Sequence, residues 1–259
     1  MNVIIFSRDR ACQLDLFFRS FKYYVKDNIK LKVLYTFSDK YFEEGYKKVK
    51  EYHPEIEYVL EKDFKNDIIN NIDTEDKYTT FFVDDIIFKN YFSLESPFFE
   101  IFRNNDDILC LSLRLHPRLT YCYTARLNMT PPKMVNNTWE WRGNRGDFGY
   151  PMSVDGHIFR TNEILPKLKS LNYRNPNSLE SVLVSSPINK PKMICCDNSV
   201  IINNPCNKVQ INNPNRHGDI NPKYLNDNFI NGYIIDLEPY KGIDNESCHK
   251  ELPVKLIKK

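Results

Sequence analysis

The sequence lacks any strong imbalance of charge, and this argues against functions that depend on a large overall field. Its 259 residues contain 36 Lys and Arg against 34 Asp and Glu, which gives a formal net charge of +2. Proteins that bind nucleic acid through their overall charge carry a clear excess of positive residues. We therefore expect no nucleic-acid partner, because such a partner would need a local basic patch.

Long apolar runs are also missing. The apolar residues 1–6 turn polar at residues 7–10, so the stretch is too short for the core of a signal peptide. No later run reaches the roughly 18 apolar residues that a membrane-spanning helix requires. We expect a soluble cytoplasmic protein without an integral membrane segment, and the abundance of Asn and Lys suggests an AT-rich bacterial or viral genome.

The seven cysteines are scattered and include no CxxC pair. A disulfide framework or a zinc knuckle would require paired, regularly spaced cysteines. We therefore interpret all seven as reduced thiols.

What is present is an alternation of strand and helix patterns in the first half. Short apolar runs predict buried strands, and apolar residues at helical spacing predict helices between them. The predicted strands are 3–6, 31–36, 56–60 and 79–83, and the predicted helices are 10–26, 41–52 and 64–72. This order predicts an α/β fold with a mostly parallel, Rossmann-like central sheet flanked by helices.

After about residue 115 the pattern loosens into segments rich in Pro, Gly and aromatic residues. Long irregular segments in a compact domain are usually functional loops or disorder, and the Trp and Tyr content disfavours disorder. We predict a single domain, residues 1–259, with nucleotide recognition in 1–115 and acceptor recognition in 116–259.

The strongest chemical signal is the pair Asp84 and Asp85, which directly follows the predicted strand 79–83. Ligands of open α/β sheets bind at the carboxyl ends of strands, where this pair would emerge. Mg²⁺ or Mn²⁺ binds one or two carboxylates and completes its coordination with water and phosphate oxygens. The alternative is a helix N-terminus capped by two acids.

A strand that ends in Asp-Asp, about 80 residues after an N-terminal strand and a polar Ser-Arg-Asp-Arg loop, resembles the DxD region of GT-A glycosyltransferases, in particular those similar to family 2. The third position of the motif, usually acidic, is Ile86 here. The resemblance implies a nucleotide-sugar donor, by family habit a UDP-sugar, Mn²⁺ or Mg²⁺, and a glycan or glycoconjugate acceptor. It places the metal on Asp85, with Asp84 toward the ribose or a metal-bound water.

The same resemblance assigns the loop after the first strand to nucleotide binding. Ser7 offers a hydrogen bond, Arg8 and Arg10 can meet phosphate or stack on a base, and Asp9 can cap the following helix or accept a donor from base or ribose. The alternative is a helix N-cap with solvated arginines.

Two further clusters carry acids that could act in the reaction. Gly156 in an apolar stretch suggests a close approach of the backbone to a ligand. The resemblance implies that this region contacts the donor sugar, a role we assign to Asp155, whereas His157 is expected to be a structural histidine. Glu180 follows Asn177 and Ser178, either of which could cap a helix, and the resemblance makes Glu180 the general base of an inverting enzyme, with Asp155 as second choice. The alternative for Glu180 is a capping-box residue.

Members of this family often complete the metal site with a C-terminal histidine, and we prefer His249 to His217 for this role.

Two rival functions stay open. A nucleotidyltransferase would normally carry a Gly-rich phosphate loop near its N-terminus, but no glycine precedes Gly45. A carbohydrate- or nucleic-acid-binding module without catalysis is motivated by Trp139 and Trp141.

Overall fold

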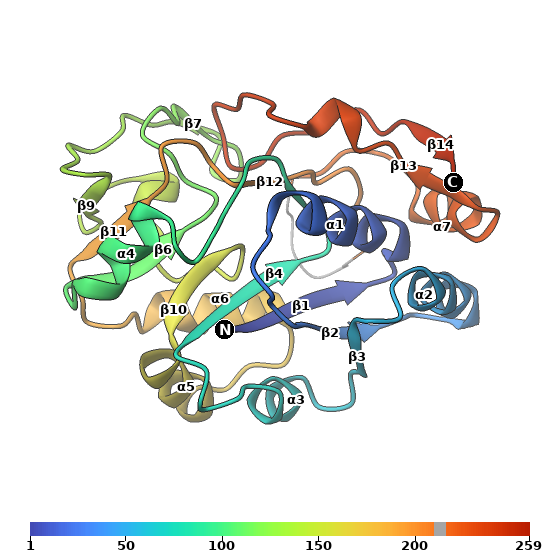
Figure 1. Ribbon diagram of the computed structural model, residues 1–259, viewed down its shortest axis with the longest axis horizontal. Coiled ribbons are helices and arrows are strands. Elements are labelled where there is room, and N and C mark those ends of the chain that lie inside the picture. Colours follow the sequence, from blue (N-terminus) through green and yellow to red (C-terminus); the bar gives the residue numbers. More distant parts are fainter. Residues whose placement is uncertain (210–215) are drawn as a thin grey trace.

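An eight-stranded sheet runs through the centre of the molecule and takes strands from both halves of the chain (Figure 1). The structure is a computed structural model that describes residues 1–209 and 216–259. The strand order across the sheet is β3 (Glu57–Leu60), β2 (Leu31–Thr36), β1 (Asn2–Arg8), β4 (Tyr78–Val83), β10 (His157–Arg160), β6 (Ile108–Ser112), β11 (Lys192–Cys195) and β9 (Thr138–Glu140). β10 and β9 run antiparallel to their neighbours, and the other strands share one direction.

Strand β1 shows why the sheet has a core on each face. Its side chains alternate, so Val3 and Ile5 join one hydrophobic cluster whereas Ile4 and Phe6 join the other. All four side chains are at most 3% exposed. A strand buried on both faces is continuously apolar, as the sequence suggested.

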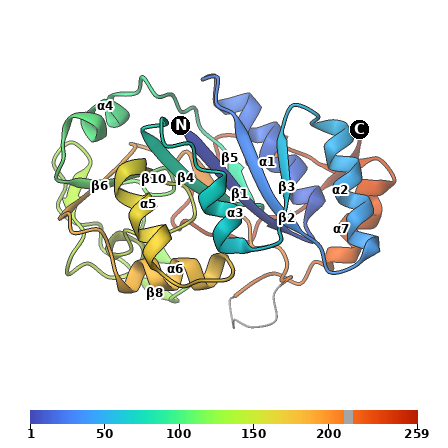
Figure 2. The same cartoon turned by 90° about the horizontal axis from the view of Figure 1, so that it is seen from below.

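Helices cover both of these faces. One face carries α1 (Ala11–Tyr24), α2 (Lys40–Tyr52), α4 (Pro97–Asn104) and α7 (Pro222–Ile230). The other carries α3 (Phe64–Asn70), α5 (Thr161–Ser170) and α6 (Pro176–Ser185), which lie in the foreground of Figure 2. The predicted α/β fold with a mostly parallel sheet flanked by helices is therefore confirmed.

Smaller elements complete the molecule around this sheet. Three two-stranded ladders pair β5 (Ile86–Phe88) with β12 (Ile201–Asn203), β13 (Tyr233–Ile235) with β14 (Leu256–Lys258), and β7 (Tyr121–Cys122) with β8 (Leu127–Asn128). The described residues also form the short 3₁₀ helices η1 (Gly146–Gly149) and η2 (Glu238–Tyr240). Among the helices in the described ranges, none has the length and apolar character needed to cross a bilayer.

The topology brings several chain segments to one edge of the sheet. β1, β4 and β6 all end at this edge, and antiparallel β10 begins there, with His157 paired to Ser112 at the end of β6. The residues that follow β1, β4 and β6, and those that precede β10, therefore lie near one another. This is the edge at which open α/β sheets bind their ligands.

Candidate functional site

Asp84 and Asp85 form a two-residue turn between β4 and β5 at the carboxyl edge of the sheet. A strand follows them rather than a helix, so the alternative in which both acids cap a helix N-terminus is wrong. Both face Arg10, the residue that precedes α1: its Nη1 atom lies 3.1 Å from Asp84 Oδ1 and 3.2 Å from Asp85 Oδ2. The guanidinium is the counter-charge for the acid pair in this structure.

Asp84 is held inside the protein by the loop after β1. Ser7 Oγ donates to Asp84 Oδ2 at 2.9 Å, and the backbone N–H of Arg8 donates to the same oxygen at 3.1 Å. Ser7 also lies 2.7 Å from the hydroxyl of Tyr46, so its contacts in this structure are with the protein. Burial raises the pKa of Asp84 to about 6, against the opposing effect of Arg10.

Asp85 is more accessible than its neighbour. Its side chain is 13% exposed, compared with 5% for Asp84. Asn203 Nδ2 donates to Asp85 Oδ1 at 3.2 Å, and burial raises the pKa of Asp85 despite the nearby Arg10. Of the two acids, Asp85 is therefore the one placed to contact a ligand.

The other two residues of the loop differ from each other. The Arg8 side chain is 54% exposed, and its Nε lies 3.7 Å from Asp9 Oδ2. Asp9 adopts a positive φ of 56° and accepts a 2.7 Å hydrogen bond from the backbone N–H of Ser38. Asp9 thus joins the loops after β1 and β2, and it does not cap α1, which has Arg10 at its N-cap without a side-chain hydrogen bond.

Asp155 and His249 meet beside this pair, although they come from distant segments. His249 Nε2 lies 3.6 Å from Asp155 Oδ2, and Arg114 Nη1 lies 3.4 Å from the same oxygen. Burial alone would raise the pKa of Asp155, but the contact with His249 and the charge of Arg114 lower it. Asp155 is therefore stabilised as an anion.

The C-terminal segment positions His249. Its backbone pairs with that of Asn203, whose side chain contacts Asp85, so His249 and Asp85 flank the same residue. The Tyr123 ring stacks on the imidazole at 6.1 Å between centroids, and the Arg216 guanidinium lies over the Tyr123 ring at 4.1 Å from its centroid. His217 instead lies 2.7 Å from the carbonyl oxygen of Gly218 through its Nδ1.

Glu180 lies on α6 and points toward the loop before β10. Glu180 Oε1 accepts hydrogen bonds from Ser153 Oγ at 2.9 Å and from the backbone N–H of Val154 at 3.1 Å. Burial raises its pKa, and the charge of Asp155 adds to this effect. A carboxylate with a raised pKa is better suited to proton transfer near neutral pH than an ordinary one.

The predicted start of the Glu180 helix was wrong by two or three residues. Asn175, rather than Asn177 or Ser178, is the N-cap, and Ser178 completes a capping box with it. Glu180 therefore lies beyond the first turn, and the alternative that it is the capping-box residue is excluded. The cause is Pro176, which is favoured at the first position of a helix.

Gly156 and His157 have structural explanations. Gly156 has a φ of 75°, and an added Cβ would overlap the Ile201 side chain, so its close approach is to the protein core rather than to a ligand. His157 is 1% exposed, and burial followed by the charge of Arg114 lowers its pKa to about 3. The expectation of a structural histidine at this position agrees with these surroundings.

Sequence reasoning missed Arg114, Asp147 and Asn203. Arg114 follows the end of β6 by two residues, so it emerges at the same edge as Asp84, and its side chain contacts Asp147 and Asp155. The signal was available: an arginine interrupts the apolar run that ends at Leu115. Nothing in the sequence marked Asp147 or Asn203, because their roles depend on contacts between distant segments.

The described residues at the site carry more negative than positive charge. Two guanidiniums, those of Arg10 and Arg114, face five carboxylates, which leaves a formal excess of three negative charges when all are ionised (five minus two). The five carboxylates belong to Asp84, Asp85, Asp147, Asp155 and Glu180. Buried acids require compensation, so a site of this kind favours a cation.

The donor groups fit a cation that is shared with a ligand. Within the described residues, no three acidic, His or Cys side chains come close enough to enclose a metal. Two buried atoms beside Asp85 have no hydrogen-bond partner, Asn203 Oδ1 and His249 Nδ1. Mg²⁺ and Mn²⁺ commonly take one or two protein ligands and fill the remaining positions with phosphate oxygens and water, which matches such a partial set.

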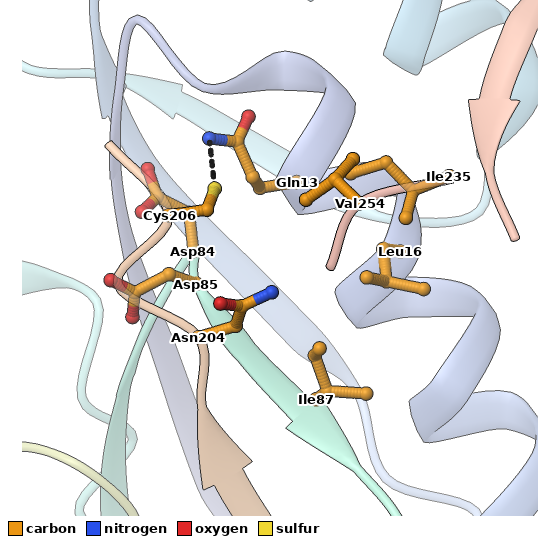
Figure 3. Close-up of a pocket in the computed structure, with 9 residues that line it drawn as sticks. All are labelled: Gln13, Leu16, Asp84, Asp85, Ile87, Asn204, Cys206, Ile235 and Val254. Atoms are coloured by element: carbon orange, nitrogen blue, oxygen red, sulfur yellow. Dashed lines mark hydrogen bonds between the residues drawn. The ribbon is translucent and has the colours of Figure 1, made fainter. Parts of the chain in front are cut away.

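A small pocket lies beneath the acid pair, between the turn and α1 (Figure 3). Its volume of about 10 Å³ has room for roughly one water molecule, so it is no substrate site. Gln13 and Cys206 contact each other across it at 3.8 Å. The accessible part of the site is the side on which Asp85, Asp155 and His249 are each 13% to 15% exposed.

The tryptophans do not form an open sugar-stacking surface. Trp139 is 2% exposed, and its indole N–H donates to the carbonyl oxygen of Phe148. Trp141 donates to the carbonyl oxygen of Lys190, and Arg142 lies 4.7 Å from the centre of its ring. The alternative of a binding module without catalysis, which was motivated by these two tryptophans, therefore loses most of its support.

Comparison with known proteins adds sequence similarity to a glycosyltransferase. No protein-family model matches the sequence. The chain is 30% identical over 189 residues to the bifunctional glycosyltransferase pgtA of Dictyostelium discoideum. The match takes in 63% of this chain but only 24% of pgtA, so the chain spans about a quarter of its relative's length.

Comparison with solved structures also returns similar chains, among them the following two. A cytidylyltransferase from Leptospira borgpetersenii serovar Hardjo-bovis has a TM-score of 0.42 and 13% identity, over 70% of this chain and 68% of its own. An active-site mutant of LgtC has a TM-score of 0.35 and 10% identity, over 76% of this chain and 72% of its own.

Proposed function

We propose that this chain is a glycosyltransferase that moves a sugar from a nucleotide-sugar, specifically a UDP-sugar, to a hydroxyl of a glycan or glycoconjugate, with inversion at the anomeric carbon. The observation that carries the proposal is the convergence of Asp85, Asp155, Glu180 and His249 from four separate segments at the ligand-binding edge of the sheet. The similarity to pgtA supports the reaction class.

The excess negative charge supports a requirement for a divalent cation. Asp85 would hold Mn²⁺ or Mg²⁺, with His249 as a second protein ligand and Asp84 behind them. When bound, such a cation neutralises the charge that develops on a departing nucleoside diphosphate. Without it, the diphosphate would enter a site already rich in carboxylates.

The loop after β1 is proposed to hold the nucleotide. Arg8 presents a largely exposed guanidinium that can bind phosphate oxygens or stack on the base. Arg10 contributes positive charge from inside the site, while Ser7 and Asp9 shape the loop through their contacts with Asp84 and Ser38. Thus two of the four loop residues act on the donor and two act on the geometry of the loop.

The surroundings of Glu180 and Asp155 favour different roles for these two acids. The pKa of Glu180 is raised, chiefly by burial, whereas that of Asp155 is lowered by His249 and Arg114 against the effect of burial. Environments that push the pKa values of two carboxyl groups apart are typical of sites in which one group transfers a proton and the other stays ionised. Glu180 would take the proton from the acceptor hydroxyl while the acceptor oxygen attacks the anomeric carbon and the nucleoside diphosphate leaves. The Asp155 anion would accept hydrogen bonds from the donor sugar.

Isothermal titration calorimetry with UDP, with and without Mn²⁺, tests the donor site. We expect binding that depends on Mn²⁺ and is lost in Asp85→Ala. The matched control is Asp106→Ala, which removes a 97% exposed aspartate and should bind like the wild type. Binding that is unchanged by chelation and by Asp85→Ala would contradict the proposal, and so would a failure to bind any nucleotide.

A further inference from the structure

Arg114 is buried among the acids of the site and binds several of them at once. Its side chain is 4% exposed. Nη2 contacts Asp147, and Nη1 lies 2.9 Å from Ser153 Oγ and 3.4 Å from Asp155 Oδ2. The forked guanidinium thus ties η1 to the loop that precedes β10.

Ser153 extends this arrangement to Glu180. Its hydroxyl oxygen accepts hydrogen bonds from Arg114 Nη1 and from the backbone N–H of Asp155, at 3.2 Å in the second case. A serine hydroxyl has one proton to donate, and here that proton goes to Glu180 Oε1. One hydroxyl therefore fixes the positions of both acids relative to Arg114.

We propose that Arg114 is a positioning residue that holds Asp155 directly and Glu180 through Ser153, with Asp147 as the anchor that fixes the guanidinium. This inference rests on the proposed sugar transfer for its functional meaning. The planar fork of arginine, with donors in fixed directions, suits a group that must contact Asp147 on one arm and Ser153 and Asp155 on the other. The single ammonium of a lysine would not span both directions.

The charges around Arg114 predict how its removal changes the site. The groups that face it from the surrounding elements are Asp147, Tyr150, Asp155, His157, Glu180, Cys248 and His249. Arg114 lowers the pKa of both Asp155 and Glu180, whereas Asp155 raises that of Glu180. Loss of the guanidinium should therefore raise the pKa of Glu180.

The test compares Arg114→Gln, Arg114→Lys and Asp147→Asn. Carboxyl ¹³C NMR of labelled protein, assigned with Glu180→Gln, follows Glu180 without any substrate. In Arg114→Gln we expect the pKa of Glu180 to rise by about one unit or more, and the acid limb of the kcat profile to move up with it. Arg114→Lys should show a smaller rise, with a lower kcat at little-changed KM.

Asp147→Asn should move the pKa of Glu180 in the opposite direction, because it frees the positive charge of Arg114 for the remaining acids. An unchanged titration of Glu180 in Arg114→Gln, with only a lower melting temperature, would overturn the proposal. If Arg114→Gln does not fold, an unchanged titration of Glu180 in Asp147→Asn would overturn it equally. If the wild type transfers no sugar, the NMR arm still decides the role of Arg114, so the two failures are distinguishable.

Discussion

The Nδ2 atom of Asn203 donates to Asp85 Oδ1 at 3.2 Å, so the last residue of β12 holds the most accessible acid of the turn after β4. The backbone of Asn203 also pairs with His249. Asp85 and His249 are thus positioned by one residue. Any ligand that contacts both will be sensitive to the way the C-terminal segment packs.

His249→Asn should weaken Mn²⁺-dependent binding of UDP by about 10- to 100-fold, since it removes a proposed ligand next to Asp85. His217→Asn is the matched control, because His217 lies beside Gly218 rather than at the acids. Calorimetry on both variants checks the prediction. Equal losses in the two variants would refute a specific role for His249.

Arg10→Gln should destabilise the protein in the absence of metal, because it leaves Asp84 and Asp85 without their counter-charge. Removing one partner from a buried ion pair costs about 3 to 5 kcal/mol. Mn²⁺ should then stabilise the variant more than the wild type, since Arg10 no longer occupies the carboxylates. Thermal unfolding with and without Mn²⁺ measures this, and an equal gain in both proteins would argue against competition between Arg10 and the metal.

Asp84 should make stability depend on pH. Its folded pKa of about 6 is above the ordinary value of 3.8, so between these values the folded protein holds a proton that the unfolded chain has released. Its contribution to the free energy of unfolding is therefore fully present below about pH 4 and falls by up to about 3 kcal/mol as the pH rises through about 6.

Denaturant unfolding of the metal-free wild type and Asp84→Asn across this pH range checks the prediction. The variant lacks the titrating group, so its stability relative to the wild type should improve as the pH rises. A difference between the two proteins that stays constant with pH would show that Asp84 does not titrate in this way.

Glu180→Gln should reduce kcat by about 100- to 10,000-fold, since an amide cannot take a proton from the acceptor. Binding of UDP with Mn²⁺ should change little, because Glu180 contacts Ser153 and Val154 rather than the acid pair. The control is Glu163→Gln, which alters an acid on α5 that pairs with Lys190. Transfer by Glu180→Gln at the wild-type rate would exclude Glu180 as the base.

The first half of the fold could be predicted from the sequence because its pattern is local. The predicted strand 31–36 has the observed bounds of β2, and the predicted helix 41–52 differs from α2 by one residue. Apolar periodicity reports burial directly in elements of this length. In the second half the strands are two to four residues long, too short for a periodic signal.

The site was predictable where an acid follows a strand or lies near the start of a helix, as Asp85 and Glu180 do. Arg10 shows what the sequence alone could not show. It was expected to meet phosphate, yet in the structure it pairs with both acids and also with Asn207 from the C-terminal half. Partners so distant along the chain leave no local pattern.

The insertion of β10 between β4 and β6 has a consequence for the synthesis of the chain. β4 and β6 do not pair with each other: β4 gains its second neighbour after β1, and β6 its first, only when residues 157–160 have been made. Until then, both strands present unpaired backbone edges, which promote association between chains. The growing polypeptide therefore cannot close its sheet during the first half of translation, and fragments that stop near residue 150 should aggregate rather than fold.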